Sequence, residues 1–196
     1  QYKTKKSREK RFFNLSFGFT KERIEKIYTL SFPRRCSIVF VFIMYTQHQI
    51  DQTIAAIATA PGEGGVAVIR VAGKQSIEIV AKAFSGPIHS YPSHTVHLGK
   101  IVNADQVIID EVLVLVMRSP KSYTGEDVVE IHCHGGSLIS RRVLETILKA
   151  GARAAGPGEF TFRAFMYGKI DLVQAEAVQN LIAAKNDLAL HAAEQQ

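Results

Sequence analysis

The sequence predicts an α/β (α+β) fold, in which a small mixed β-sheet with flanking helices is followed by the start of a helical domain. Short stretches rich in β-branched residues are typical of strands. Apolar residues at helical spacing after turn-forming segments are typical of amphipathic helices. The chain has 196 residues, of which 46% are hydrophobic, so it is long enough to bury a full core.

The charge of the chain is unevenly distributed. Residues 1–43 contain eleven Lys/Arg and three Asp/Glu, a balance of +8, and residues 44–196 contain 13 and 15, a balance of −2, which together give the net +6. The second part is therefore slightly acidic, which argues against nucleic-acid binding by this domain alone. We expect three regions: a basic extension outside the fold (1–43), a sheet domain (44–167) and a truncated helical domain (168–196).

The first region has no predicted function. Its apolar run, which ends at residue 43, is about half the length of about 20 residues that a membrane span needs. Its leader is too long and too rich in glutamate for a signal peptide. We expect translated sequence upstream of a start at Met44, or an unselected extension. Cys36 and Cys133 look unpaired, which favours a reducing cytoplasm, and no membrane association is expected.

The sheet domain is predicted to begin with two strands joined by a glycine-rich loop at residues 61–65. This loop lacks the spacing of a P-loop and no helix follows it directly, which excludes the dinucleotide fingerprint. Arg70 interrupts the second strand and is either an edge or surface arginine or an anion clamp. The predicted elements up to residue 117 are strands at 53–59 and 66–71, a helix at 76–84, and strands at 94–102 and 107–117.

The stretch at residues 122–136 organises the rest of the prediction. Its strand, 128–134, places Glu130, His132 and His134 on one face and apolar residues on the other, so the polar face is expected to border a cleft or an interface. Glycines then turn the chain into an amphipathic helix with Ser137 as its N-cap and Lys149 in its last turn.

Two chemical interpretations of this stretch remain open. Glu130, His132 and His134 share a face and have metal-binding side chains, but a hydrogen-bonded cleft is the simpler interpretation, and no metal is predicted. The adjacent Glu126 and Asp127 are expected to serve turn formation and solvation rather than acid–base chemistry. Cys133, on the opposite face, is expected to be a small buried hydrophobe.

The last part of the chain is predicted to be helical. A short helix at residues 160–165 follows a Gly-Pro-Gly turn, and Asp171 is expected to cap a final helix. That helix reaches Gln196 without a glycine stop, so we expect it to be cut off rather than completed.

Several long motifs in this order resemble the N-terminal region of the MnmE/TrmE family of tRNA-modification GTPases. They occupy residues 53–70, 122–136, 157–165 and 168–177. The resemblance runs from residue 53 to the end of the chain and leaves residues 1–43 unmatched. It implies a domain similar to the tetrahydrofolate-binding domain of the glycine-cleavage T protein, and a homodimer.

The resemblance also implies a ligand and its binding residues. The family binds a 5-formyl-tetrahydrofolate-type one-carbon carrier near its dimer interface, and its folate-contacting positions correspond to Arg70, Glu130 and Lys169. We assign Glu130 to the pterin edge, because a carboxylate accepts paired N–H donors, and Arg70 and Lys169 to the carboxylates of the ligand. No residue is assigned a catalytic role.

Other functions of the family depend on segments that do not occur in this sequence. The full-length proteins contain a GTPase domain, which uses GTP, Mg and K, and a C-terminal cysteine motif. They act with a flavoprotein partner, MnmG/GidA, on the wobble uridine (U34) of tRNA. Without a Walker-type loop, this chain is expected neither to bind nor to hydrolyse GTP. The alternatives are a remnant that folds and dimerises without ligand and a metal-dependent hydrolase using the His pair.

Overall fold

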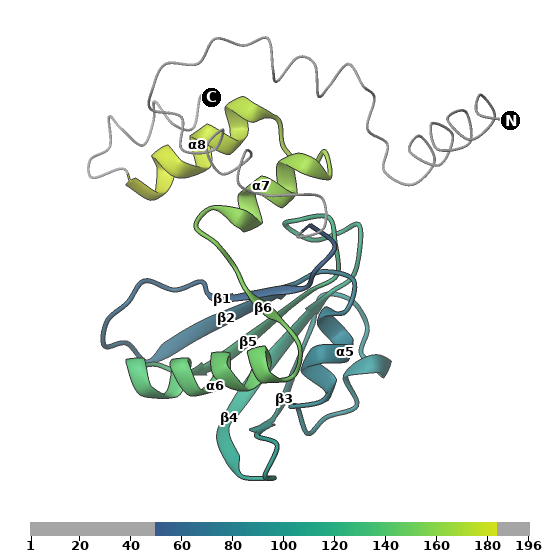
Figure 1. The fold of residues 1–196 in the computed structure, drawn as a ribbon, viewed down its shortest axis with the longest axis vertical. Coiled ribbons are helices and arrows are strands. Elements are labelled where there is room, and N and C mark those ends of the chain that lie inside the picture. Colours follow the sequence, from purple (N-terminus) through teal and green to yellow (C-terminus); the bar gives the residue numbers. More distant parts are fainter. Residues whose placement is uncertain (1–49, 184–196) are drawn as a thin grey trace, which may run out of the picture. The chain divides into compact units, whose positions relative to one another are not determined.

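The computed structural model describes residues 50–183, which form a mixed sheet with helices beside it (Figure 1). The predicted α/β class is therefore confirmed. In chain order, the elements are β1 (Ile54–Ile57), β2 (Val66–Ala72), α5 (Ser76–Ala81), the 3-10 helix η1 (Ile88–Ser90), β3 (Thr95–Val102), β4 (Ile108–Met117), β5 (Val128–His134), α6 (Ser137–Lys149), β6 (Arg153–Ala154), α7 (Glu159–Met166) and α8 (Leu172–Ala183).

The sheet has six strands in the order β3-β4-β5-β2-β1-β6. β6 pairs with β1 in parallel, and every other pair is antiparallel. Two of the predicted strands, β3 and β4, pair directly with each other as an antiparallel hairpin. β3 lies at one end of the strand order and is an edge strand, whereas β5 and β2 are central.

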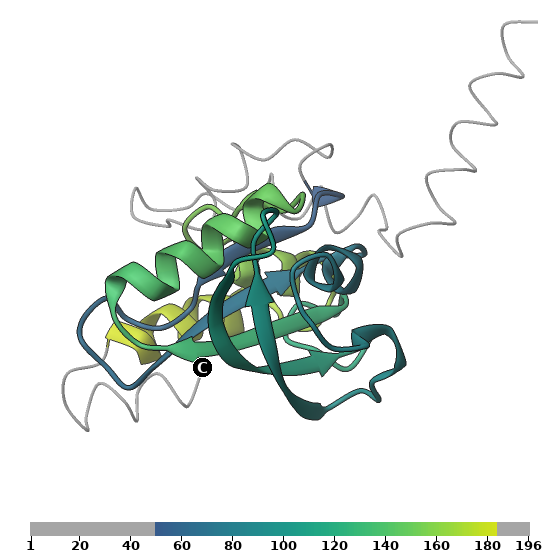
Figure 2. The same cartoon turned by 90° about the horizontal axis from the view of Figure 1, so that it is seen from below.

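One face of the sheet packs against α5 and α6. The alternation in β5 directs Val129, Ile131 and Cys133 to this side, where all three are buried. Figures 1 and 2 show α6 running across the sheet, and it contributes Val143 and Ile147 to the same apolar cluster. This face holds most of the core, because the larger of the two clusters of buried apolar residues lies here. Burial of each such aliphatic side chain contributes about 1.5–3 kcal/mol. The prediction that Cys133 is buried is confirmed.

Among the described residues, the second face is covered only in part. Phe160 of α7 packs there against a small cluster formed by Ile54, Ala72 and Val128. The rest of this face carries Glu130 and His132, which are neither fully buried nor fully exposed. The predicted division of β5 into an apolar and a polar face is therefore confirmed.

Several helix boundaries differ from the predictions. Ser137 is the first residue of α6 rather than its N-cap, which is Gly136 with a φ of 97° that favours glycine. Helix α5 ends at Ala81, because Phe84 leaves the helical path to bridge Ile101. Helix α7 extends from Glu159 to Met166, one residue longer at each end than predicted.

The predicted cap of the last helix is confirmed. The N–H of Gln174 donates to Oδ1 of Asp171 at 2.8 Å, and the N–H of Asp171 donates to the Gln174 side chain at 3.0 Å. Within residues 50–183, no helix combines the length and the apolar character that crossing a membrane requires. The expectations for residues 1–43 and for the end of the final helix fall outside the described residues.

The core face gives a direct stability prediction. Ile131 is fully buried in the central strand β5, so Ile131→Ala leaves a cavity and is expected to lower the free energy of unfolding by about 2–5 kcal/mol. Urea denaturation followed by circular dichroism measures the change. Ile108→Ala, at an exposed position of β4, is the control and should change it by about 0.5 kcal/mol or less. Equal losses in both variants would contradict the assignment of the core.

Candidate functional site

The centre of the partly covered face holds an ion pair. Arg70 of β2 lies opposite Glu130 of β5 in the strand register. Nε of Arg70 donates a hydrogen bond to Oε1 of Glu130 at 2.8 Å. The side chains are 27% and 15% exposed, so water screens the pair less than it screens a fully exposed one. Two of the three predicted binding residues are therefore in contact.

Two aromatic rings lie close to the guanidinium group of Arg70. Its Cζ lies 5.4 Å from the centroid of the Tyr123 ring and 5.6 Å from that of Phe160. A hydrogen bond of 2.9 Å between the hydroxyls of Tyr123 and Thr161 joins the loop before β5 to α7. The sequence prediction did not include Tyr123 or Phe160. Both lie within the motifs of the resemblance, but no periodicity indicates that the two segments meet.

The two histidines of β5 have separate neighbours. Nε2 of His132 lies 3.6 Å from Oε2 of Glu130, whereas Nδ1 of His134 is 2.8 Å from Oδ1 of Asp110. Asp110 also accepts a hydrogen bond from the backbone N–H of His134. The part of the chain between residues 50 and 183 contains no group of three His, Cys, Asp or Glu residues placed to hold a metal ion.

Lys169 lies at the edge of this region. Its Nζ donates to the carbonyl of Pro120 at 3.1 Å. Its aliphatic part lies against Gly125, where an added Cβ would come within 3.1 Å of Cγ of Lys169. Among the described residues, no hydrogen bond or ion pair joins Lys169 to Arg70 or Glu130. The structure thus brings Lys169 to the loop that carries Tyr123, but not into contact with the ion pair.

A buried charge network fixes α7 next to the site. Arg163 is fully buried, and its Nη1 lies 3.3 Å from both carboxylate oxygens of Glu126. Its Nη2 donates to Oε1 of Glu159 at 3.2 Å and to the carbonyl of Gln52 at 2.6 Å. Arg153 adds a second ion pair to Glu159. The structure therefore joins α7, the segment before β1 and the loop before β5.

The network corrects the prediction for Glu126. This residue was expected to be solvated, but it is buried against Arg163 because α7 covers the end of the sheet. Asp127 does serve the loop as predicted, since its Oδ1 accepts a hydrogen bond from the N–H of Ser119 at 2.8 Å. Each of the two carboxylates therefore has a structural partner.

The buried groups have altered pKa values. Burial raises the pKa of Glu126 above its usual value, and the charge of Arg163 only partly offsets this. Burial also acts on Glu159, but hydrogen bonds from Arg153 and the Gly156 N–H, with the charge of Arg163, leave its pKa below the usual value. Burial together with the charge of Asp110 raises the pKa of Cys133 to about 11, so its thiol stays protonated at neutral pH.

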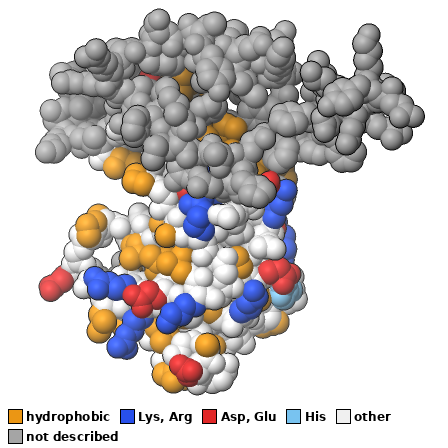
Figure 3. All heavy atoms as spheres, in the orientation of Figure 1, with side chains coloured by type: hydrophobic (Ala, Val, Ile, Leu, Met, Phe, Trp, Pro, Cys, Tyr) orange, Lys and Arg blue, Asp and Glu red, His pale blue; other side chains and the backbone are white. Residues whose placement is uncertain are grey.

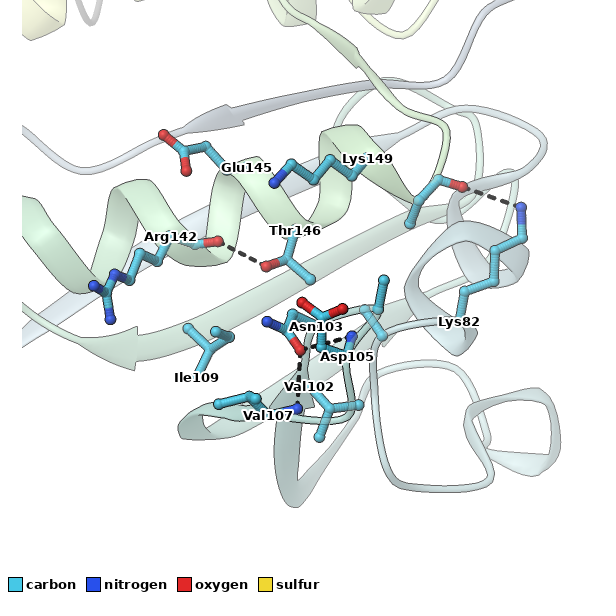
Figure 4. A pocket seen from close by; sticks show the side chains of 13 residues that line it. Lys82, Val102, Asn103, Asp105, Val107, Ile109, Arg142, Glu145, Thr146 and Lys149 are labelled. Atoms are coloured by element: carbon cyan, nitrogen blue, oxygen red, sulfur yellow. Dashed lines mark hydrogen bonds between the residues drawn. The ribbon is translucent and has the colours of Figure 1, made fainter.

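A pocket of about 480 Å³ lies on the other side of the sheet (Figure 4). Its lining includes residues from the outer side of α6 and from the turn between β3 and β4, and none of Arg70, Glu130 and Lys169 is among them. In Figure 4 the charged groups of Arg142, Glu145 and Lys149 point in different directions and do not converge on one point. The pocket is therefore separate from the predicted site.

The described part of the surface in Figure 3 has no continuous basic area. Over the described residues, Lys and Arg side chains lie among Asp, Glu and hydrophobic side chains. Phosphate-backbone binding depends on clustered cations, so this face by itself does not resemble a nucleic-acid interface.

Comparisons with known proteins agree with the arrangement of the motifs. A family model described as the N-terminus of the GTP-binding protein TrmE matches residues 53–169. A protein named tRNA modification GTPase MnmE from Protochlamydia amoebophila (strain UWE25) is 68% identical over 145 residues, which cover 74% of this chain and 32% of the relative. Its namesake from Chlamydia felis (strain Fe/C-56) is 56% identical over 144 residues, covering 74% and 32%. The chain thus spans about a third of the length of these curated relatives.

The lowered pKa of Glu159 makes a prediction about acid stability. A carboxyl group whose pKa is lower in the folded than in the unfolded state stabilises the fold above its unfolded pKa, and this contribution is lost as the pH falls through the folded pKa. The unperturbed value is 4.5, so the loss is expected below about pH 4.5. Urea unfolding between pH 3 and 7 should therefore show a smaller acid-dependent loss in Glu159→Gln than in the unmodified chain. An unchanged pH dependence in the variant would contradict this role for Glu159.

Proposed function

The chain belongs to the family described as the N-terminus of the GTP-binding protein TrmE, and on this premise we propose that it binds a 5-formyl-tetrahydrofolate-type one-carbon carrier and forms a homodimer. The observation that carries the proposal is the Arg70–Glu130 pair on the partly covered face of the sheet. The carrier offers both kinds of group that this pair can bind, because its pterin edge presents N–H donors and its glutamate tail presents carboxylates.

The hydrogen bonding of the pair leaves capacity for a ligand. Within the described residues, Arg70 bonds to Glu130 through Nε alone, which leaves its two other guanidinium nitrogens for a carboxylate. The carboxylate of Glu130 has further acceptor positions for the pterin N–H groups. We assign Lys169 to the ligand's carboxylates, because its ammonium group lies at the loop that carries Tyr123. The Tyr123 ring is in turn close to Arg70.

The homodimer is proposed to use the open part of the same face. Val96 and Leu98 of β3 and Leu113 of β4 are 55%, 65% and 44% exposed, although the positions beside them are half-buried in β3 and buried in β4. The register places Leu98 directly opposite Leu113, so the three side chains form one apolar surface beside the edge of the sheet. A second copy of the chain would remove this surface from water in a symmetric contact.

We place this domain within a longer protein, because the chain spans about a third of its relatives. In that protein, the region from about residue 44 to 167 supplies carrier binding and dimerisation, and residue 168 begins a helical domain. The binding of GTP, Mg and K, the partnership with an MnmG/GidA-like flavoprotein and the modification of U34 in tRNA are proposed for the whole protein. Its proposed location is the cytoplasm.

One observation favours the alternative of a remnant that folds without binding a ligand. Arg70 and Glu130 already neutralise each other, so the polar face needs no ligand to satisfy its charges. In this alternative the ion pair serves only to hold β2 against β5.

A binding measurement separates the two functions. Calorimetric titration of the 196-residue chain with 5-formyl-tetrahydrofolate is expected to show saturable binding. Glu130→Gln keeps the shape of the side chain but removes its charge, and should weaken binding by about 10-fold to 100-fold, because hydrogen bonds to charged groups contribute about 1.5–3 kcal/mol. Glu111→Gln, an exposed position of β4, is the control and should bind as the unmodified chain does. A folded chain that does not bind the carrier would support the remnant.

The proposed dimer surface is tested by a charge at its centre. Leu98→Glu should raise the dimer dissociation constant by at least about 10-fold, because a carboxylate buried between two copies has no partner there. Light scattering coupled to size-exclusion chromatography over a concentration series measures this shift. Leu138→Glu introduces the same charge at an exposed position of α6 and should leave the dimer intact. Equal dissociation of both variants, or a monomeric unmodified chain, would contradict the assignment.

A further inference from the structure

Among the described residues, Nε2 of His132 is a buried nitrogen without a hydrogen-bond partner. The register places His132 between Val68 of β2 and Leu113 of β4, neither of which offers a polar side chain. An enclosed polar atom without a partner costs about 1–3 kcal/mol, so such atoms in native structures require an explanation.

The position of this nitrogen relates it to the proposed ligand. Nε2 of His132 and Oε2 of Glu130 lie 3.6 Å apart. Neutral imidazole can present an N–H at Nε2, and an ionised carboxylate only accepts. The strand therefore places a hydrogen-bond donor and an acceptor side by side. Such a pair is complementary to a cyclic amide edge, H–N–C=O, whose donor and acceptor are also neighbours.

We propose that Glu130 and His132 together bind the N3–H and O4 edge of a pterin, with His132 as a residue that determines specificity. This inference rests on the proposed function and identifies which ring edge the site binds. Glu130 accepts hydrogen bonds from N3–H and the 2-amino group, and Nε2–H of His132 donates to the 4-oxo group. A third of the His132 side chain is exposed. Binding of the ligand would require the ring to rotate so that its enclosed nitrogen faces the pterin.

The inference predicts discrimination at one atom of the ligand. A 4-oxo pterin supplies an acceptor for His132, whereas the 4-amino analogue presents an amino group and lacks N3–H in its neutral form. Discrimination of this kind is strong when a binding site is built around a hydrogen bond, because the wrong ligand leaves a polar group unpaired. The carrier class is therefore 4-oxo pterins rather than 2,4-diaminopteridines.

The test compares two ligands in four forms of the full 196-residue chain. Calorimetry measures the dissociation constants of 5-formyl-tetrahydrofolate and its 4-amino-4-deoxy analogue. His132→Leu removes the donor at similar size, and His132→Gln restores a donor. His134→Leu, two residues along the same face, is the matched control, because the His134 imidazole pairs with Asp110 instead.

The unmodified chain is expected to prefer the 4-oxo ligand. His132→Leu should weaken binding of that ligand by about 5-fold to 10-fold, the effect of losing one hydrogen bond, and leave the 4-amino analogue nearly unchanged. His132→Gln should recover most of the preference, and His134→Leu should keep all of it. A preference that is the same in His132→Leu and the unmodified chain overturns the role of His132 but leaves the proposed function intact. No binding of either ligand by the unmodified chain overturns both.

Discussion

The candidate site depends on the buried ion pairs of Arg163. This side chain is fully buried, and it bonds to Glu126 in the loop before β5, to Glu159 in its own helix and to the carbonyl of Gln52 before β1. A buried arginine without these partners would cost several kcal/mol, so the three segments are held in one arrangement. As a consequence Tyr123 and Phe160, which come from two of these segments, both lie close to the guanidinium group of Arg70. The site is thus part sheet and part helix.

Between residues 50 and 183, helices close only one of the two faces of the sheet. Helices α5 and α6 cover the face where the aliphatic residues of β2, β4 and β5 form the main core. Helix α7 covers only one end of the other face. The remaining area combines an ion pair in the central strands with exposed apolar residues in β3 and β4. A ligand at the centre and a second copy at the edge are compatible uses of one surface, since their residues do not overlap.

The sequence predicted the local parts of this structure and missed the long-range ones. Alternation in residues 128–134 gave the two faces of β5, and turn chemistry gave the cap at Asp171, because both are set by neighbours in the chain. The prediction that Glu126 is solvated was wrong, because its partner Arg163 is 37 residues away and no sequence pattern links the two. The proximity of Tyr123 and Phe160 to Arg70 was missed for the same reason. Arg70 and Glu130 were predicted as binding residues from the motifs, and the strand register explains why they are in contact.

Hydrogen–deuterium exchange with and without saturating 5-formyl-tetrahydrofolate reports where on the chain the carrier binds. We expect slower exchange in residues 119–127 and in α7 (Glu159–Met166), which supply the two rings close to Arg70. We expect no change in α6 (Ser137–Lys149), which lines the pocket on the other side of the sheet. Protection confined to α6 and the turn between β3 and β4 would contradict these expectations, since the carrier would then occupy the pocket rather than the Arg70–Glu130 face.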